Sequence, residues 1–425
     1  MHLVDRWHEA LARDDRPPTD FLRQVAASGA VHGDEPLCIH RRPHFVEARL
    51  VSDLTRSLKL FHAAVRRLRA GVIEQGLDGA LVRSMGIDPR AMELVRIHPG
   101  YESAALIARV DCFVPDGRPR FLELNGESPA GIAYADALSE VFDADPLSRL
   151  LGDMSRFWST DAVVHAVQDT WQEWGGLGRP QVAIVDYREV PTWPEFVLFR
   201  QRFRALGMPC VLADPRELEW DGQHLRHEDR VIEVVYRRIL VQDILERPQD
   251  CTALIAAYRA GAICMVNSLR TPLLHGKGLF ALLHDAEVQR RLTRAQRRMV
   301  GDCIPYTVMV DDAHREEART RREELVLKPI WGHAGEGVVL GWRCTQTEWD
   351  DALEAARDHV LQERVEEQHL LFPDARRGYA LRDCMVDLDP FLIRGRFAGF
   401  LCRISEGPTA NVAAGATQVP VYVAS

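Results

Sequence analysis

The sequence predicts a mixed α/β and α+β protein, and three patterns along its 425 residues support this prediction. Over residues 1–100, apolar side chains recur three and four positions apart, which is typical of amphipathic helices. Two strand-like runs flank a Pro-Asp-Gly turn at 115–117, which predicts a β-hairpin. Residues 180–265 alternate strand-like and helical runs, which predicts a parallel sheet, and residues 266–425 mix both kinds of element.

The expected elements follow in order along the chain. Helical patterns cover 20–30 and 48–76, and the hairpin strands follow at 107–114 and 120–125. The next unit is expected to contain a strand at 181–187, a helix at 194–207 and strands at 209–215 and 230–240. No glycine-rich fingerprint follows the first of these strands, which argues against a dinucleotide site. The last part is expected to contain a helix at 275–292, a strand at 324–329, a glycine-rich turn at 332–342, a helix near 347–360 and strands at 379–393, 397–405 and 419–424.

Composition excludes several classes of function. The 53 basic and 62 acidic side chains give a formal net charge of −9, which argues against nucleic acid or an anionic membrane as a partner. No apolar run approaches the roughly 20 residues that span a bilayer, and the charged start lacks the apolar core of a secretion signal. The nine cysteines form no C-x-x-C pair, which fits a cytoplasmic protein in a reducing compartment. The sequence leaves the oligomeric state open.

The hairpin is expected to have one polar and one apolar face, because side chains in a strand alternate with period two. With the turn centred on Gly117, the numbers of opposite residues sum to 234. Asp111 then faces Glu123. By the same sum, Arg109 faces Asn125, so these four residues share one face. The other face would consist of Val110, Cys112, Leu122 and Leu124.

Two opposed acids on this face favour a bound cation. Like charges directly across two strands destabilise the pair by several tenths of a kcal/mol. Mg²⁺ removes this repulsion because it prefers oxygen ligands, and it usually takes further ligands from substrate phosphates. Asp111, Glu123 and Asn125 are therefore candidate ligands of a nucleotide-bound Mg²⁺. The pattern also fits a solvated face that Arg109 neutralises, and a β-bulge that slips the register would separate these residues.

A lysine on a strand precedes a glycine-rich loop near the end of the chain. Lys328 lies on the predicted strand, and Gly332, Gly335 and Gly337 follow it. Glycine lets backbone N–H groups turn toward phosphate oxygens, and the lysine supplies positive charge. This favours phosphate binding, although no Walker A sequence is present and an ordinary glycine-containing hairpin gives the same pattern.

Other residues carry weaker signals. Lys277, taken alone, is typical of a surface lysine, and residues 362–365 form a strand-to-loop passage whose backbone fits an adenine edge. Arg403 and Asn411 are candidate polar contacts. No serine or cysteine is marked as a nucleophile by its neighbours. A late acidic group alternates with apolar residues, as in a half-buried strand, and competes with the hairpin as the metal site: Asp383, Asp387 and Asp389.

Taken together and in order, these segments resemble the circularly permuted ATP-grasp ligases of the glutathionylspermidine-synthase-like type. The resemblance rests on ARVDCFV with FLELNGESPAG, then VVYRR, NSLRTPLLHGKGLFALL, LVLKPIWGHAGEGVVLG, VLQERV, FAGFLCRIS and NVAAGATQVPV. It covers roughly the last three quarters of the chain. In ordinary ATP-grasp enzymes the metal-binding E-x-N follows the glycine loop, whereas here E-L-N precedes it by about 200 residues, as in the permuted group.

The resemblance implies a circularly permuted ATP-grasp fold with a Rossmann-like pre-ATP-grasp domain and a helical N-terminal region. The implied parts are a helical region at 1–100, a hairpin with helices that carries the metal site at 101–175, a Rossmann-like domain at 176–265 and a nucleotide-binding part with the glycine-rich loop at 266–425.

The resemblance also implies a role for each matching residue. Asp111, Glu123 and Asn125 would hold Mg²⁺, while Arg109 and Lys328 would act in catalysis, the arginine on the transferring phosphoryl group. Lys277 and Lys328 would contact ATP phosphates, and the loop with Gly332, Gly335 and Gly337 would close over them. Gln362, Glu363 and Val365 would line the adenine pocket, and Ser128 and Arg403 would contact substrate.

The implied reaction is ATP-dependent ligation of a carboxylate to an amine through an acyl phosphate, with ADP and phosphate released. The cofactors would be ATP and Mg²⁺, and the substrates small-molecule or peptide acids and amines. Such chemistry requires positioning and charge neutralisation rather than a protein nucleophile. Phosphotransfer on the same scaffold and ATP binding without turnover are the alternatives. The basic residues Arg237, Arg238 and Arg270 fit either contacts to an acidic substrate or structural ion pairs.

Overall fold

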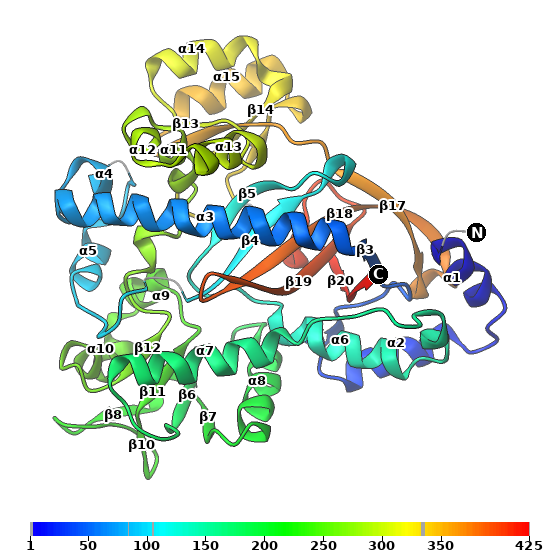
Figure 1. Cartoon of the computed structure of the whole chain (residues 1–425), viewed down its shortest axis with the longest axis horizontal. Coiled ribbons are helices and arrows are strands. Elements are labelled where there is room, and N and C mark those ends of the chain that lie inside the picture. Colours follow the sequence, from blue (N-terminus) through cyan, green and yellow to red (C-terminus); the bar gives the residue numbers. More distant parts are fainter. Residues whose placement is uncertain (1–2, 84, 104–105, 333–335, 425) are drawn as a thin grey trace.

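A six-stranded antiparallel sheet forms the centre of the protein (Figure 1). The computed structural model describes residues 3–83, 85–103, 106–332 and 336–424. Strands β20, β19, β18, β4 and β5 are neighbours in that order, and β17 pairs with the first half of β18. The last residues of β18 pair with β4, which joins the early hairpin to the end of the chain. The strands are β4 (Ile107–Phe113), β5 (Arg120–Asn125), β17 (Gln368–Asp374), β18 (Ala380–Ile393), β19 (Arg396–Ser405) and β20 (Thr417–Val419).

The apolar face of the hairpin packs against the long helix α3 (Ala48–Gln75), which crosses the sheet in Figure 1. Val110 and Leu124 are buried in the same core as residues of this helix. Phe61 of α3 meets Phe121 of β5 edge to face, with ring centroids 5.6 Å apart. Because side chains alternate along each strand, the polar residues of the hairpin lie on the face away from α3.

A four-stranded parallel sheet, with the order β12-β11-β6-β7, forms a separate unit at the lower end of Figure 1. Alternate residues of its strands belong to two different cores, one with α7 and α8 and one with α10, so helices cover both faces. The strands are β6 (Val182–Val185), β7 (Cys210–Ala213), β11 (Val234–Arg237) and β12 (Cys264–Val266). The helices are α6 (Ile132–Ala144), α7 (Ser159–Trp174), α8 (Trp193–Ala205), α9 (Val241–Glu246) and α10 (Thr252–Arg259).

The prediction of one strand over 230–240 was wrong, because the chain changes sheets at Glu233. The backbone N–H groups of Glu233 and Val234 both donate to the carbonyl of Gln181, which marks the break. The residues before it form β10 (Arg230–Ile232), which belongs to a small antiparallel sheet with β8 (Leu218–Trp220) and β9 (Leu225–His227).

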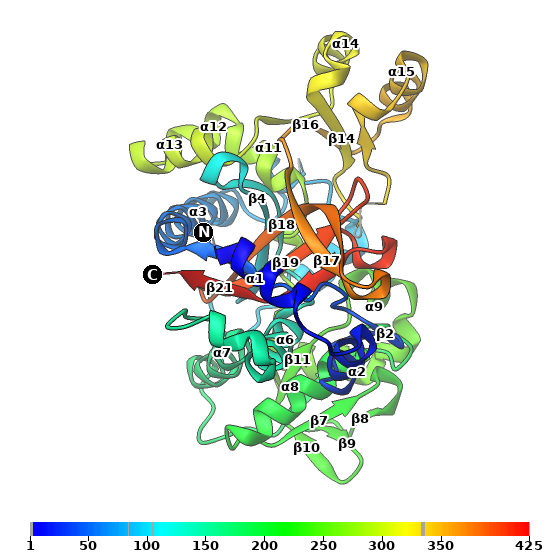
Figure 2. The ribbon, with the colours of Figure 1, turned by 90° about the vertical axis from the view of Figure 1, so that its right-hand side faces the viewer.

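The glycine-rich loop belongs to an antiparallel sheet with the order β13-β16-β14-β15, at the opposite end of the molecule from the parallel sheet (Figure 2). The helix predicted over 275–292 is two helices, because Asp285 has an extended backbone and its side chain caps the second one. The strands are β13 (Thr307–Met309), β14 (Leu325–Pro329), β15 (Val339–Leu340) and β16 (His359–Glu363). The helices are α11 (Gly278–His284), α12 (Ala286–Arg291), α13 (Arg294–Cys303), α14 (Asp312–Thr320) and α15 (Gln346–Ala355).

The N-terminal region is largely helical, as predicted, and it also contributes a strand to the end of the chain. Strand β3 (His44–Glu47) runs parallel to β21 (Val421–Ala424), so the beginning and the end of the chain pack together. The remaining elements are α1 (Leu3–Ala12), α2 (Pro18–Ala27), β1 (Val31–His32), β2 (Glu35–Pro36), α4 (Ala80–Arg83) and α5 (Pro89–Val95). The four domain boundaries given by the sequence stay a prediction.

Candidate functional site

The hairpin has the predicted pairing where its polar residues lie. Arg109 pairs with Asn125. Asp111 pairs with Glu123, and the side chains of all four residues line one cavity. The predicted hairpin and its polar face are therefore confirmed.

The hairpin also contains the β-bulge that the sequence left open. The register shifts after Asp111, so that Cys112 faces Phe121 instead of Leu122. The assignment of Leu122 to the apolar face was wrong: Phe121 fills that core position, while half-buried Leu122 lines the cavity. Because the bulge lies between the polar pairs and the turn at 115–117, it changes the turn side of the hairpin and leaves the pairs intact.

Two later strands bring three more charged residues to this face. On β18, Asp389 accepts a hydrogen bond from the backbone N–H of Cys112 at 3.0 Å. Asp387, also on β18, lies opposite Arg403 of β19. One oxygen from each of three carboxylates, Asp111, Asp387 and Asp389, lies within 4.8 Å of the others. We call the following residues the charged cluster: Arg109, Asp111, Asp387, Asp389 and Arg403.

The late acidic group is thus part of the hairpin site, except for one member. Asp383 lies at the exposed end of β18, where its side chain is 69% accessible, and it pairs with His369 at 3.5 Å. The two sites that competed in the sequence are one site in the fold, because β18 lies directly beside β4.

Arg403 occupies the space between the three carboxylates. Its Nη2 lies 2.7 Å from Asp111 Oδ2, 2.6 Å from Asp387 Oδ2 and 2.8 Å from Asp389 Oδ2. Arg109 adds a bond of 2.8 Å from Nε to Asp111 Oδ1 and approaches Asp389 Oδ2 at 3.6 Å. A guanidinium therefore stands where a metal ion bound by these three acids would be.

The carboxylates of the charged cluster have opposite pKa shifts. Burial alone would raise the pKa of Asp111, but Arg109 and Arg403 outweigh it and hold this pKa below the usual value. Burial raises the pKa of Asp389, Arg403 opposes this shift, and the carboxylates of Asp111 and Asp387 add to it. Burial also raises the pKa of Asp387, against the opposing effect of Arg403.

A cavity of about 210 Å³ opens between the charged cluster and the sheet that carries the glycine-rich loop. Ten of the residues predicted from the sequence line it, which is most of the predicted set. They come from the hairpin, from α11 and the turn before it, from β14, from β16 and the loop after it, and from β19: Arg109, Asp111, Glu123, Asn125, Lys277, Lys328, Gln362, Glu363, Val365 and Arg403.

The two lysines face the hairpin from the other side of this cavity. Lys277 Nζ lies 3.4 Å from Glu123 Oε2 and donates to the carbonyl of Gly332 at 3.1 Å. Lys328 donates to Gln362 Oε1 at 2.7 Å. Burial and the positive charge of Lys277 lower the pKa of Lys328 to about 8, against the opposing effect of Glu123. Two cations directed into one cavity suit a polyanion.

The glycine-rich loop connects β14 and β15, which pair in antiparallel fashion as a hairpin does. Gly332 and Gly337 have positive φ values of 132° and 70°, so both take backbone conformations that side chains disfavour. A Cβ at Gly337 would lie 3.2 Å from the Pro329 ring. Gly335 lies outside the described residues. The predicted closure of this loop over phosphates stays a prediction.

The predicted adenine residues line this cavity, with several neighbours that the sequence did not reveal. The backbone N–H groups of Glu363 and Arg364 donate to the carbonyls of Tyr306 and Glu324. The buried side chain of Gln362 accepts a hydrogen bond from Lys328, and its Nε2 donates to the carbonyl of Leu122 and to Thr307 Oγ1. The missed residues form apolar walls, and no local motif marks them: Val326, Leu340, Trp342 and Met385.

A second cavity, of about 730 Å³, lies on the other side of the charged cluster. The predicted substrate residue Ser128 lines it, together with Gly332 of the loop. We call it the acceptor cavity and the first one the nucleotide-side cavity, after the roles that the sequence resemblance implies for Ser128 and for Lys328. Four residues line both cavities and so mark where they meet: Arg109, Asn125, Arg403 and Asn411. The sequence missed most of its other lining residues, including Glu127, Tyr134, His275 and Trp331.

The basic residues Arg237, Arg238 and Arg270 are structural. Arg237 is fully buried and bonds to Glu127 at 2.8 Å and to the carbonyl of Ile239 at 2.6 Å. Arg238 donates to the carbonyl of Pro129 at 2.8 Å, and Arg270 donates to backbone carbonyls near residue 96. None of the three lines the acceptor cavity as described.

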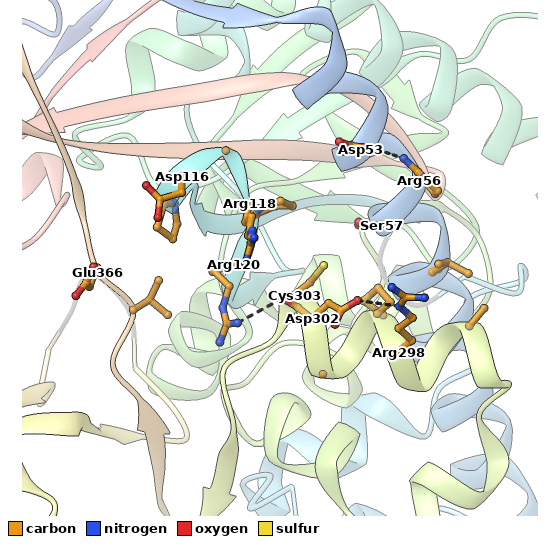
Figure 3. A pocket seen from close by; sticks show the side chains of 18 of the residues that line it. Asp53, Arg56, Ser57, Asp116, Arg118, Arg120, Arg298, Asp302, Cys303 and Glu366 are labelled. Atoms are coloured by element: carbon orange, nitrogen blue, oxygen red, sulfur yellow. Dashed lines mark hydrogen bonds and ion pairs between the residues drawn. The ribbon is translucent and has the colours of Figure 1, made fainter.

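A third cavity, of about 980 Å³, lies beside the turn of the hairpin and is shown in Figure 3. It shares only Val365 with the predicted site. Its lining mixes arginines with acids: Arg298 pairs with Asp302 at 3.3 Å, and Arg56 pairs with Asp53. This cavity therefore offers no single sign of charge to a phosphate, despite its size.

The hairpin oxygens fit a hard divalent cation. Among the described residues, the polar partners of the Glu123 carboxylate are Lys277 at 3.4 Å and Asn125 at 3.5 Å. Asn125 donates through Nδ2 to Asp111 Oδ1 at 2.7 Å, which leaves its Oδ1 for another ligand. A carboxylate and an amide oxygen beside an open cavity match the chemistry of Mg²⁺. Asp111 is committed to its guanidinium partners, so it would serve as a third ligand only by giving up one of those bonds.

The fold and the site define a protein that combines a nucleotide-side cavity with a Rossmann-like unit and a charged hairpin. Residues 89–405 match the model of the circularly permuted ATP-grasp type 2 family. Because this is about three quarters of the chain, the protein belongs to that family. The predicted family and the predicted fold class are confirmed. Proteins of this family generally use ATP and Mg²⁺.

Two curated relatives resemble part of the chain. A Frankia alni protein named putative glutamate–cysteine ligase 2-3 is 27% identical over 304 residues, which are 66% of this chain and 33% of that protein. A Frankia casuarinae protein named putative glutamate–cysteine ligase 2-2 is 26% identical over 305 residues, with the same coverage. The chain thus spans about a third of the length of the relatives it matches.

One solved structure shares the fold over nearly the whole length. A glutathione synthetase-like effector from Globodera pallida matches with a TM-score of 0.66 at 13% identity and covers 96% of both chains. At this identity the likeness shows the fold alone. Within the part of the chain that the structure describes, no helix combines the length and the apolar character needed to cross a bilayer.

Proposed function

We propose that this protein is an ATP-dependent carboxylate–amine ligase that forms an amide bond and releases ADP and phosphate. One observation carries the proposal: the nucleotide-side and acceptor cavities meet at Arg109, Asn125 and Arg403. Transfer of a phosphoryl group from a nucleotide to a carboxylate requires both reactants to approach one such point in line. The cluster also places positive charge where negative charge develops.

The residues of this chain can be assigned to the two steps. Lys277 and Lys328 hold the phosphates, and Glu123 with Asn125 holds Mg²⁺, which when bound neutralises phosphate charge. Arg109 then stabilises the transferring group while a substrate carboxylate oxygen attacks the γ-phosphorus and the bond to ADP breaks. An amine next attacks the acyl carbon of the acyl phosphate, the carbon–oxygen bond breaks and phosphate leaves. The glycine-rich loop between the cavities excludes water from this intermediate.

The substrates are proposed as small acids and amines. The names of the curated relatives suggest glutamate and cysteine as the first pair to test. Val365, at the end of the nucleotide-side cavity, is proposed to offer its backbone to the adenine edge. A cytoplasmic location is proposed because the nine cysteines are free thiols, as expected in a reducing compartment.

The test is product identity in a screen of paired acids and amines. Protein, Mg²⁺ and ATP are incubated with amino acids, short peptides and amines in pairs, starting with glutamate and cysteine. The proposal expects ADP and phosphate in equal amounts, together with an amide, only when both members of a pair are present. AMP with pyrophosphate would rule the mechanism out. ADP release that needs no amine would indicate phosphotransfer, and stabilisation by Mg·ATP without ADP would indicate a binding protein.

A further inference from the structure

We propose that Glu127 and His275 form the subsite that binds the ammonium group of the amine substrate, and that His275 accepts its proton. This inference rests on the ligase function proposed above. Both side chains line the acceptor cavity, together with the arginines of the charged cluster at which the acyl phosphate would form. The subsite therefore lies in the same cavity as the carbon that the amine must reach.

Glu127 is anchored through one oxygen and open at the other. Its Oε1 accepts hydrogen bonds from Arg237 Nη1 at 2.8 Å and from the backbone N–H of Val241 at 2.6 Å. Among the described residues, its Oε2 has only the ring of His275 as a partner, at 3.9 Å. The ion pair with buried Arg237 keeps this carboxylate charged, and the second oxygen remains available to a cation from the cavity.

His275 is held at the right place to complete the subsite. Its backbone N–H donates to the carbonyl of Thr271 at 2.7 Å, and its ring lies against Trp331 with centroids 6.3 Å apart. Its Nε2 is too far from Glu127 Oε2 for a direct hydrogen bond. The gap of 3.9 Å lets one ammonium nitrogen lie within hydrogen-bond distance of both atoms.

The ring of His275 faces one acid directly. That acid is Glu127, while Trp331 lies beside the ring and Met85 lines the same small pocket, both without charge. His275 also lies two residues before Lys277, so one short segment carries both the amine subsite and a phosphate contact. The other charged groups of the same cavity are Asp88, Glu246, Glu336, Arg109 and Arg403, with His32 as a further titratable side chain.

The chemistry requires such a base. A primary ammonium is protonated near neutral pH and has no lone pair for attack on carbon. Transfer of one proton from the ammonium nitrogen to the imidazole of His275 leaves a neutral amine, whose lone pair forms the amide bond as phosphate departs. The resulting imidazolium is stabilised by Glu127 and loses its proton to solvent after the reaction. General base catalysis of this kind contributes typically 10²- to 10⁴-fold.

The experiment compares two nucleophiles that differ in their need for a base. Wild type and His275→Gln are given the acid selected in the substrate screen, with L-glutamate as the first probe, and either L-cysteine or hydroxylamine. Hydroxylamine is uncharged at neutral pH and traps the acyl phosphate as a hydroxamate without losing a proton first. The variant is expected to lose at least 100-fold in amide formation and less than threefold in hydroxamate formation. His369→Gln, an exposed histidine outside both cavities, is the matched control.

The outcomes separate the two proposals. If wild type forms no hydroxamate with any acid in the screen, the ligase function itself fails. If wild type forms hydroxamate and His275→Gln keeps both products, or loses both equally, the subsite is wrong. If His275→Gln does not fold, His275→Asn replaces it and is given the same two nucleophiles. A selective loss of amide formation supports the subsite, and an equal loss of both products would overturn the role of His275.

Discussion

The two cavities on either side of the charged cluster are built in different ways. The nucleotide-side cavity takes most of its lining residues from strands, including alternate positions of β4 and β18 and residues of β5, β14 and β19. The acceptor cavity takes much of its lining from loops and from the short helix α9, such as 127–130, 240–242 and Trp331 with Gly332. Strand alternation and a short glycine motif are visible in a sequence, whereas a wall made of loops from distant segments is not. Under the proposed function, the nucleotide contacts are therefore visible as local sequence patterns, whereas the substrate contacts form only in the fold.

Removal of the guanidinium at the boundary between the cavities should have the largest effect. Arg403→Leu leaves three buried carboxylates with Arg109 alone, and an uncompensated buried charge typically costs about 3–5 kcal/mol. Urea unfolding should show this loss of unfolding free energy, and ligase activity should disappear. Arg382→Leu breaks an exposed ion pair with Glu406 and should cost no more than about 1 kcal/mol. Equal losses of unfolding free energy in the two variants would show that Arg403 does not compensate the buried charge of the cluster.

The next largest effect is expected in the nucleotide-side cavity, at Glu123, the carboxylate with the longest contacts to its neighbours. Glu123→Ala should lower turnover by about 100- to 1,000-fold, because a group that stabilises charge in the transition state is lost. Its thermal midpoint should stay close to wild type, since Glu123 makes only long contacts. Asp383→Ala, which removes an exposed acid of β18, should retain full ADP release. Full activity in Glu123→Ala would remove the hairpin from the site.

The sequence predicted the polar pairs of the hairpin correctly although it placed the centre of the turn wrongly. The sum of 234 pairs Asp111 with Glu123, as in the structure. On the turn side of the bulge at Leu122, however, Cys112 pairs with Phe121, so the turn is not centred on Gly117. Local alternation could not show this extra residue. The contact between Cys112 and Asp389 spans 277 positions in the chain, and no local signal shows that β18 lies beside β4. Only the fold therefore shows that the acids of the hairpin and the acids of β18 form one site.

The acceptor cavity illustrates the same limit more strongly. Ser128 was found because it adjoins the hairpin motif in the sequence. Glu127 and His275 are also close in sequence to predicted site residues, but a lone acid and a lone histidine are usually structural. Only the fold shows that these two side chains lie near each other. The break at Glu233 was missed for a related reason, since a continuous apolar run does not show where a chain changes sheets.

A smaller and pH-dependent effect is expected at the buried lysine of the nucleotide side. Burial lowers the pKa of Lys328 to about 8, so the side chain is charged below this pH and loses its proton above it. One pH unit above the pKa about a tenth of the lysine remains protonated, and the affinity for Mg·ATP should fall about tenfold between pH 7 and pH 9. Calorimetric titration at the two pH values measures this change. Lys328→Arg keeps its charge, and its affinity should vary much less; an equal pH dependence would assign the effect to another group.

The smallest expected effect is a change in KM that shows which substrate each cavity binds. Ser128→Ala removes one neutral hydrogen-bonding group from the acceptor cavity, worth about 1 kcal/mol or about fivefold in affinity. It should raise KM for the acid or the amine by this factor and leave KM for ATP unchanged. Thr409→Val, in the nucleotide-side cavity, should do the reverse. If both variants raise KM for the same substrate, the cavities do not divide the substrates as proposed. The charged cluster would then be the wall of one continuous binding site rather than the point where two reactants meet.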